Sequence, residues 1–219
     1  MMRVAFIADG SSDRMLVAPI RWLLNDIDDG RELLFDFIDL RGLPTVARTL
    51  SERIQTVLQQ NAYDLLLVHR DAEKEGPSKR QAEVRDALAQ ALERMATAER
   101  RGRTGVPVVP VVPVRMSEAW LLFSERAIRR AARNPRSTVE LDLPVVGRVE
   151  SIPDPKDILH RASVVASGAS GRRLEKFRPE VRVHDIQNWI TDWSPLDETS
   201  AFRALREDLQ AVILDIRIQ

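Results

Sequence analysis

The chain has 219 residues, with 33 lysine and arginine residues against 33 aspartate and glutamate residues, and no cysteine. This length corresponds to one domain, or to one domain with an appended part, and it allows a buried core without disulfide bonds or structural metals. The lack of cysteine excludes a disulfide scaffold, a cysteine-ligated zinc site and a thiol nucleophile. The zero net charge excludes a global basic field for non-specific nucleic-acid binding.

Two further features concern localisation and partners. No run approaches the roughly 18–20 uncharged apolar residues that a membrane helix requires, and the first apolar run ends at Asp9 without a cleavage pattern for a signal peptide. We therefore expect a cytoplasmic protein that does not enter the membrane. Basic residues are concentrated in the middle of the chain, with a net charge of +6 over 76–135 against −4 over 1–75. A nucleic-acid partner would therefore have to meet a local basic patch.

Three strand-then-helix units are predicted in the first hundred residues. A compact apolar run over 3–8 predicts a buried strand, and a helix follows over 13–25, with a kink expected at Pro19. The other two units are a strand over 33–40 with a helix over 45–60, and a strand over 63–69 with a charged helix that begins after the 76–78 break and ends near residue 101.

The next segment, over 106–114, reads VPVVPVVPV. Proline has no N–H to donate to a neighbouring strand, so this strand is expected at an edge of the sheet or only partly paired. A helix over 117–132 follows, capped by Ser117 and with Glu118 in its first turn. Strands that alternate with helices predict an α/β fold, with a mainly parallel sheet and helices on both faces.

The sequence pattern changes after residue 135. We expect a loop over 136–151, a helix over 155–166, a flexible break over 167–171, and helices over 184–193 and 199–216. The prediction is therefore an α/β domain over 1–135 and a helical C-terminal subdomain over 136–219 that packs against it.

Acidic residues follow three of the predicted strands. Asp9 follows the first strand, Asp71 and Glu73 follow the third, and Glu118 follows the fourth. Functional groups of a parallel sheet collect beyond the carboxyl ends of its strands, and carboxylates gathered there repel one another unless a cation such as Mg²⁺ lies between them. Asp13 is expected to lie next to these acids and to support them without binding the cation directly.

Each of these acids also has an ordinary structural interpretation. Asp9 suits an Asp-Gly turn, and Glu118 suits the first turn of a helix; only their shared location favours a functional site. The three histidines show no metal-ligand spacing, and a structural role is predicted for each of them. Neither GxGxxG nor GxxxxGK[ST] occurs in the chain, which argues against nucleotide binding by either of these motifs.

Three motifs carry a family resemblance, namely Asp9-Gly10-Ser11-Ser12-Asp13, His69-Arg70-Asp71-Ala72-Glu73 and RMSEAWLL over 115–122. In these motifs the chain resembles the DUF4276 family of Toprim-like bacterial proteins, and looser matches at 150–156, 174–177 and 199–202 extend the resemblance through nearly the whole chain. The resemblance implies a Toprim-type site, in which a glutamate after the first strand and an Asp-x-Asp after a later strand bind Mg²⁺ for phosphodiester chemistry. Relatives often occur beside an ABC-type or AAA ATPase in bacterial phage-defence operons.

The chain departs from the Toprim pattern at two positions. Asp9 stands where glutamate is usual, and Glu73 stands where the second aspartate is usual. Both changes keep the charge and alter the reach of the carboxylate by about 1.5 Å, one carbon–carbon bond. Metal binding stays plausible under these changes.

The leading hypothesis is a nuclease or phosphodiesterase that depends on Mg²⁺ or Mn²⁺, acts on nucleic acid and serves as an effector in bacterial phage defence. Its catalytic residues would be Asp9, Asp71, Glu73 and Glu118, with Asp9, Asp71 and Glu73 as metal ligands and Arg70 and Arg115 as phosphate-binding residues. One alternative is a non-catalytic binding or regulatory partner of an ABC-type or AAA ATPase. A third hypothesis is an aspartyl-phosphate phosphotransferase. In such an enzyme only Lys74 and Lys79 are candidates for the lysine that binds the phosphate.

Overall fold

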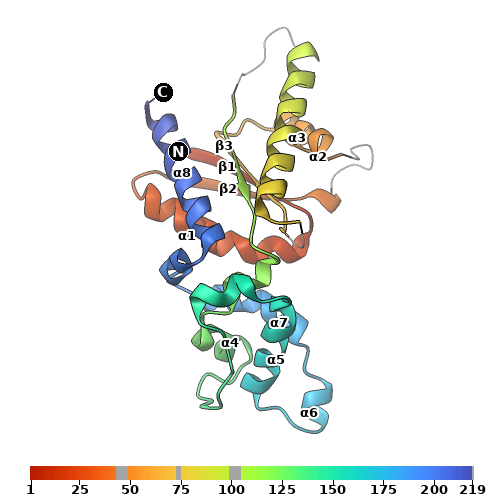
Figure 1. Cartoon of the computed structure of the whole chain (residues 1–219), viewed down its shortest axis with the longest axis vertical. Helices are drawn as coiled ribbons and strands as arrows, with labels where there is room; N and C mark the ends of the chain where they lie inside the picture. The colour runs from red at the N-terminus through yellow and green to blue at the C-terminus, as the bar shows by residue number, and fades with distance from the viewer. Residues whose placement is uncertain (43–48, 73–74, 99–104, 219) are drawn as a thin grey trace.

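A four-stranded parallel sheet forms the centre of the molecule (Figure 1). The computed structural model describes residues 1–42, 49–72, 75–98 and 105–218. Its strands are β1 (Met2–Ala8), β2 (Leu33–Asp39), β3 (Leu65–His69) and β4 (Val108–Val111), in the spatial order β2-β1-β3-β4. The two central strands are almost fully buried, as expected for continuous apolar runs in a parallel sheet. The predicted α/β class is therefore confirmed.

Helices cover both faces of this sheet. Successive side chains of a strand point to opposite faces, so Val4 and Phe6 of β1 share a core with α1 (Val17–Ile27) and α8 (Ser200–Ile218). Ala5 and Ile7 instead share a second core with α2 (Leu50–Gln60) and α3 (Pro77–Ala98). Figure 1 shows α2 and α3 side by side, away from α1 and α8.

The proline-rich strand β4 lies at one edge of the sheet, as predicted. Its partner in the sheet is β3, where Pro110 lies opposite Val68. An edge strand has one side without ladder hydrogen bonds, so the missing N–H of Pro110 is tolerated there.

The second half of the chain adds a helical region below the sheet in Figure 1. Its helices are α4 (Glu125–Ala131), α5 (Pro155–Ser167), α6 (Arg172–Glu175) and α7 (Pro179–Ile186), and its 3₁₀ turns are η4 (Val146–Ser151), η5 (Gln187–Trp189) and η6 (Ser194–Glu198). Buried side chains of this region belong to the same apolar core as α1. The last helix, α8, then returns to the sheet and packs against α1 and β4. The division of the chain at residue 135 stays a prediction.

Two predicted helices differ from those observed. The first consists of a 3₁₀ turn, η1 (Ser11–Leu16), followed by α1, and Pro19 lies in the first turn of α1, where no intrahelical N–H bond is lost and no kink is needed. The helix predicted over 117–132 is likewise divided, into η3 (Ser117–Leu121) and α4. Ser124, and not Ser117, caps α4 by accepting a hydrogen bond from the amide of Ala127.

Other boundaries shift by a few residues. The helix predicted over 184–193 ends as an α-helix at Ile186 and continues only as the turn η5. Parts of two further predictions, 45–48 of the second helix and 99–101 of the third, lie outside the described residues. A short 3₁₀ turn, η2 (Leu40–Gly42), follows β2.

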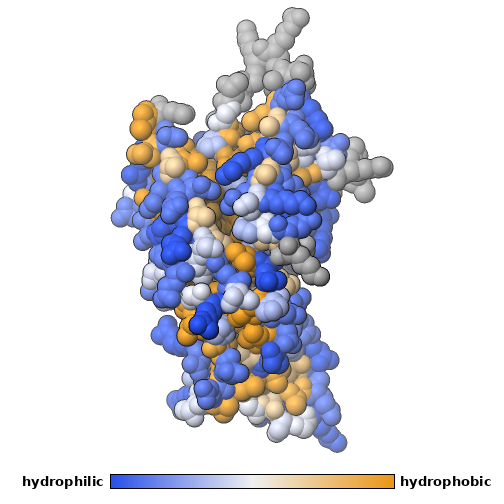
Figure 2. Space-filling model, viewed as in Figure 1, coloured by the Kyte–Doolittle hydropathy of each residue, from blue (hydrophilic) through white to orange (hydrophobic). Residues whose placement is uncertain are grey.

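Exposed surfaces are mostly polar. Hydrophilic side chains cover most of the face drawn in Figure 2, and apolar side chains show in smaller areas between them. Within the part of the chain that the structure describes, no helix is both long and apolar enough to cross a membrane.

Candidate functional site

Four polar side chains from three segments meet beyond the carboxyl ends of β1 and β3. Asp13 lies on η1, His69 ends β3, Asp71 follows it, and Ser117 begins η3. Nε2 of His69 lies 3.6 Å from Oδ1 of Asp71 and 3.8 Å from Oδ1 of Asp13. The hydroxyl of Ser117 donates to Oδ1 of Asp71 at 3.2 Å. The parallel topology thus brings together residues that are more than a hundred positions apart in sequence.

The ring of His69 is fixed by the neighbouring edge strand. Its Nδ1 lies 3.0 Å from the carbonyl oxygen of Val111, and a carbonyl oxygen only accepts, so Nδ1 carries the hydrogen of this bond. Nε2 is therefore the nitrogen that faces the two carboxylates. The sequence predicted only a structural role for His69, although its position as the last residue of a buried strand could have placed it at the rim of the sheet.

Asp71 lies in the most perturbed electrostatic environment of this group. Burial raises the pKa of its carboxyl group, and the nearby carboxylates of Asp13 and Glu118 raise it further. His69 and the hydrogen bond from Ser117 act in the opposite direction, and the resulting pKa is about 6. Glu118 is itself buried, at 9% exposure. Three carboxylates therefore share one partly desolvated region.

Ser117 and His69 lie close enough to suggest a nucleophilic pair, with 3.4 Å between the hydroxyl oxygen and Nε2. Ser117 is only 3% exposed and His69 only 2%, and the serine hydroxyl is directed to Asp71. A nucleophile has to reach the substrate, so this burial favours a positioning role for both residues.

Asp9 belongs to a second network at the same end of the sheet. Its Oδ2 accepts a hydrogen bond from Nη1 of Arg70 at 2.5 Å, and Nη2 of Arg70 donates to Glu83 of α3 at 2.7 Å. Glu83 also accepts from Arg80 at 2.7 Å. Burial acts to raise the pKa of Glu83, but the hydrogen bonds from Arg80 and Arg70 outweigh it and lower the pKa below its usual range. The predicted phosphate-binding Arg70 is thus held by two carboxylates.

Arg115 shapes the segment that delivers Ser117 and Glu118. Its backbone has φ of 66°, and the amide of Met116 donates to the carbonyl of Val114 at 3.0 Å, which closes a three-residue turn. A left-handed conformation costs a residue other than glycine about 1 kcal/mol. Such strain is concentrated at functional sites, and here it turns the chain from β4 into η3 beside Asp71.

Arg41 is a further basic residue at this rim that the sequence did not single out. Its guanidinium lies over Gly10 so closely that a Cβ at Gly10 would stand 3.0 Å from Cζ of Arg41. Arg41 is the second residue after β2, and that position after a strand was the available signal.

The predicted site residues are therefore only partly brought together. Asp71 and Glu118 share one environment, which also includes Asp13, whereas Asp9 pairs with Arg70. Glu73 lies outside the described residues. Among the residues that the structure describes, no group of three or more histidine, aspartate or glutamate side chains is arranged as a preformed metal site.

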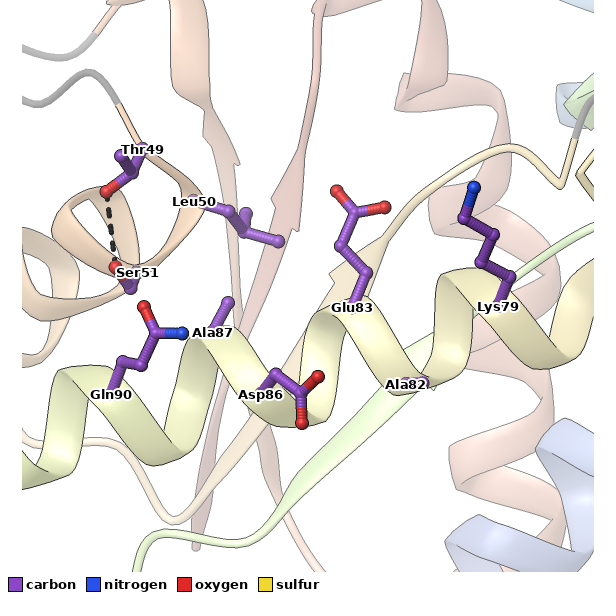
Figure 3. A pocket seen from close by; sticks show the side chains of 9 residues that line it. All are labelled: Thr49, Leu50, Ser51, Lys79, Ala82, Glu83, Asp86, Ala87 and Gln90. Atoms are coloured by element: carbon purple, nitrogen blue, oxygen red, sulfur yellow. Dashed lines mark hydrogen bonds between the residues drawn. The ribbon is translucent and has the colours of Figure 1, made fainter.

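A separate hollow of about 410 Å³ lies between the start of α2 and α3 (Figure 3). Its lining includes Glu83, Asp86 and Lys79, together with Thr49 and Ser51, whose hydroxyls are 3.1 Å apart. Two acids against one lysine do not favour an anion, and Glu83 is already bound to Arg70 and Arg80. This hollow is therefore not a candidate for the reactive centre.

No protein-family model, curated protein or solved structure matches this chain. The function is therefore inferred from the residues and their geometry.

Proposed function

We propose that this protein is a phosphodiesterase that depends on a divalent cation and acts on nucleic acid. The observation that carries the proposal is the environment of Asp71, in which the carboxylates of Asp13 and Glu118 help to raise its pKa to about 6. Like charges held together in a partly desolvated place are relieved by a cation. This crowding occurs beyond the carboxyl ends of parallel strands, where such folds place their reactive groups.

The donor set fits Mg²⁺ or Mn²⁺, because both ions prefer carboxylate oxygens. Asp71 and Asp13 would hold the cation, together with Glu73, which stays a ligand predicted from sequence alone. When bound, such a cation activates water and neutralises charge on a phosphate group.

The remaining residues have roles that follow from their contacts. Ser117 holds one oxygen of Asp71, and His69, fixed by Val111, faces both Asp71 and Asp13. Glu118 is the candidate to accept a proton from water. Asp9 and Glu83 both bind the guanidinium of Arg70, so they hold it at the rim and neutralise its charge.

The resemblance to Toprim-like DUF4276 proteins supports the same chemistry and suggests the biological setting. Under this proposal the protein is an effector in bacterial phage defence, with an ABC-type or AAA ATPase as a partner. The parallel α/β sheet agrees with that resemblance.

Calorimetry and cleavage assays on matched variants test the proposal. Mg²⁺ and Mn²⁺ are titrated into the wild type, Asp71→Asn and Asp215→Asn, the last being an exposed aspartate of α8. We expect saturable binding that Asp71→Asn weakens about tenfold or more, and cleavage of labelled RNA and DNA that it lowers about a hundredfold, because both need this carboxylate. Asp215→Asn should change neither. Cleavage by Asp71→Asn at the wild-type rate would refute the proposed role of Asp71.

The alternative function is a non-catalytic partner of an ATPase. The ion pair between Asp9 and Arg70 favours it, because the acid that follows β1 is already neutralised by the protein itself. In that case the calorimetric titrations give no saturable heat with either ion, and Asp71→Asn leaves every nucleic-acid assay unchanged.

A further inference from the structure

A groove of about 580 Å³ runs along the outer edge of β2. Within the described ranges β2 has β1 as its only strand neighbour, so its other edge is open. The groove is lined from both faces of the sheet. Arg14, Arg21, Phe35 and Phe37 lie on the α1 side, and Arg3, Asp36, Gln60, Asn61 and Tyr63 lie on the other side.

The arginines of this groove lie on aromatic rings. The guanidinium carbon of Arg14 is 4.4 Å from the ring centre of Phe37, and that of Arg21 is 5.9 Å from the ring centre of Phe35. A guanidinium stacked on a ring keeps its N–H edge open, and this edge matches the oxygens of a phosphate. Arg14 lies on η1 and Arg21 on α1, seven residues further along the chain.

The charge of the groove is unbalanced. Arg3, over the ring of Tyr63 at 5.0 Å, pairs with Asp36 at 3.1 Å. Arg14 and Arg21 are exposed, and no ion pair joins either of them to an acid in the part of the chain that is described. Two stacked cations without counter-charges are therefore available to an anionic ligand.

The position of the groove connects it to the candidate site. Arg14 directly follows Asp13, one of the carboxylates near Asp71, and the groove extends from there along β2. We propose that this groove binds a single strand of nucleic acid and directs it toward the carboxylates of Asp13 and Asp71. The inference deepens the proposed function and rests on it for the chemistry, but the binding step can be measured without cleavage.

Single-stranded nucleic acid fits these features better than a duplex does. Grooves for single strands combine cations that follow the phosphates with aromatic rings and arginine planes on which bases stack. The amides of Gln60 and Asn61 add hydrogen-bonding groups to the lining. A duplex keeps its bases stacked inside and would use only the cations.

Fluorescence anisotropy measurements in EDTA test the inference. The probes are labelled oligo-U and oligo-dT of about 12 nucleotides, a length within the span of one such binding site. The test variant is Arg14→Gln with Arg21→Gln. The matched control, Arg172→Gln with Arg173→Gln, removes the same charge from exposed residues of α6, at the opposite end of the molecule (Figure 1).

We expect the test variant to bind about tenfold or more weakly. The slope of log affinity against log salt should fall by about 1.4, because each phosphate contact with a single strand contributes about 0.7. The control should change affinity less than about twofold. If the double variant does not fold, Arg21→Gln alone is measured, with an expected change in slope of about 0.7, since glutamine is nearly as good a helix former as arginine at this exposed position of α1.

Three results would overturn the inference. They are an equal loss in test and control variants, a duplex of the same length that binds as tightly as the single strand, and competition by an oligo-glutamate peptide as strong as that by oligo-U. Calorimetry shows whether the proposed groove or the proposed enzyme is wrong. Strand binding that depends on Arg14 and Arg21 without any heat from Mg²⁺ supports the groove and removes the enzyme, whereas Mg²⁺ binding without strand binding removes the groove alone.

Discussion

Asp71 is an acid whose ionisation works against the folded state. Its pKa rises from 3.8 to about 6, first through burial and then through Asp13 and Glu118. The folded protein therefore binds this proton more tightly than the unfolded chain does. Stability from this group is greatest below about pH 4 and decreases as the pH rises through about 6. A shift of about two units corresponds to about 3 kcal/mol at most, and we reduce this to about 1–2 kcal/mol because the side chain is 31% exposed.

Asp71→Asn should therefore stabilise the protein above pH 6. Asparagine keeps an oxygen that accepts the hydroxyl of Ser117 and removes the charge that Asp13 and Glu118 repel. Urea denaturation without divalent ions should show the variant about 1–2 kcal/mol more stable than the wild type at pH 7.5 and equal to it near pH 4. Asp215→Asn serves as the exposed control, with no such difference between the two pH values. A destabilised Asp71→Asn at pH 7.5 would show that the charge of Asp71 is compensated.

At the scale of single elements, α2 is held at its start by a reciprocal cap. The amide of Glu52 donates to the hydroxyl of Thr49 at 3.2 Å, and the amide of Thr49 donates to the carboxylate of Glu52 at 2.9 Å. Thr49→Ala removes the first of these bonds and should cost about 1 kcal/mol of unfolding free energy. Thr138→Ala, at an exposed threonine without a side-chain hydrogen bond in the described structure, should change stability by less than about 0.5 kcal/mol. Equal values for the two variants in urea denaturation would contradict the role of the cap.

Sequence patterns predict the strands better than the helix starts. Continuous apolar runs identify β1 and β3 because burial on both faces leaves few polar residues in them. Ser117 looks like the cap of the helix predicted over 117–132, but its hydroxyl bonds across the fold to Asp71, and α4 begins only after Ser124. Local spacing carries no information about such a tertiary contact.

The candidate site, too, can be predicted from the sequence only in part. Acids at strand ends predict that Asp71 and Glu118 share one environment, which parallel topology brings about. The pairing of Asp9 with Arg70 depends on where α3 places Glu83, and the inclusion of His69 depends on the register of β3 with β4. Both are set by packing between distant elements, so the sequence pattern alone does not reveal them.

At the scale of the whole molecule, one apolar core joins the sheet to the C-terminal helices. Phe202 of α8 makes an edge contact with Trp120 of η3, with 5.3 Å between ring centres, and lies 6.5 Å from Trp22 of α1. These three rings connect the last helix with the segment that carries Ser117 and Glu118. Because Trp120 lies on the same turn as Glu118 and packs against Phe202, loosening α8 also loosens the support of the carboxylates near Asp71.

Phe202→Ala should therefore weaken the whole fold and not only its C-terminal end. The side chain is fully buried, and deleting a buried phenylalanine costs about 3–5 kcal/mol. Urea denaturation followed by far-UV and near-UV circular dichroism should show one coincident transition in the wild type, shifted to lower urea in the variant. Leu214→Ala, at a leucine of α8 that is 58% exposed, should shift the midpoint little. Separate transitions in the two signals would show that the sheet keeps its structure when α8 detaches, and would thereby separate the stability of the carboxylate site from that of the C-terminal helices.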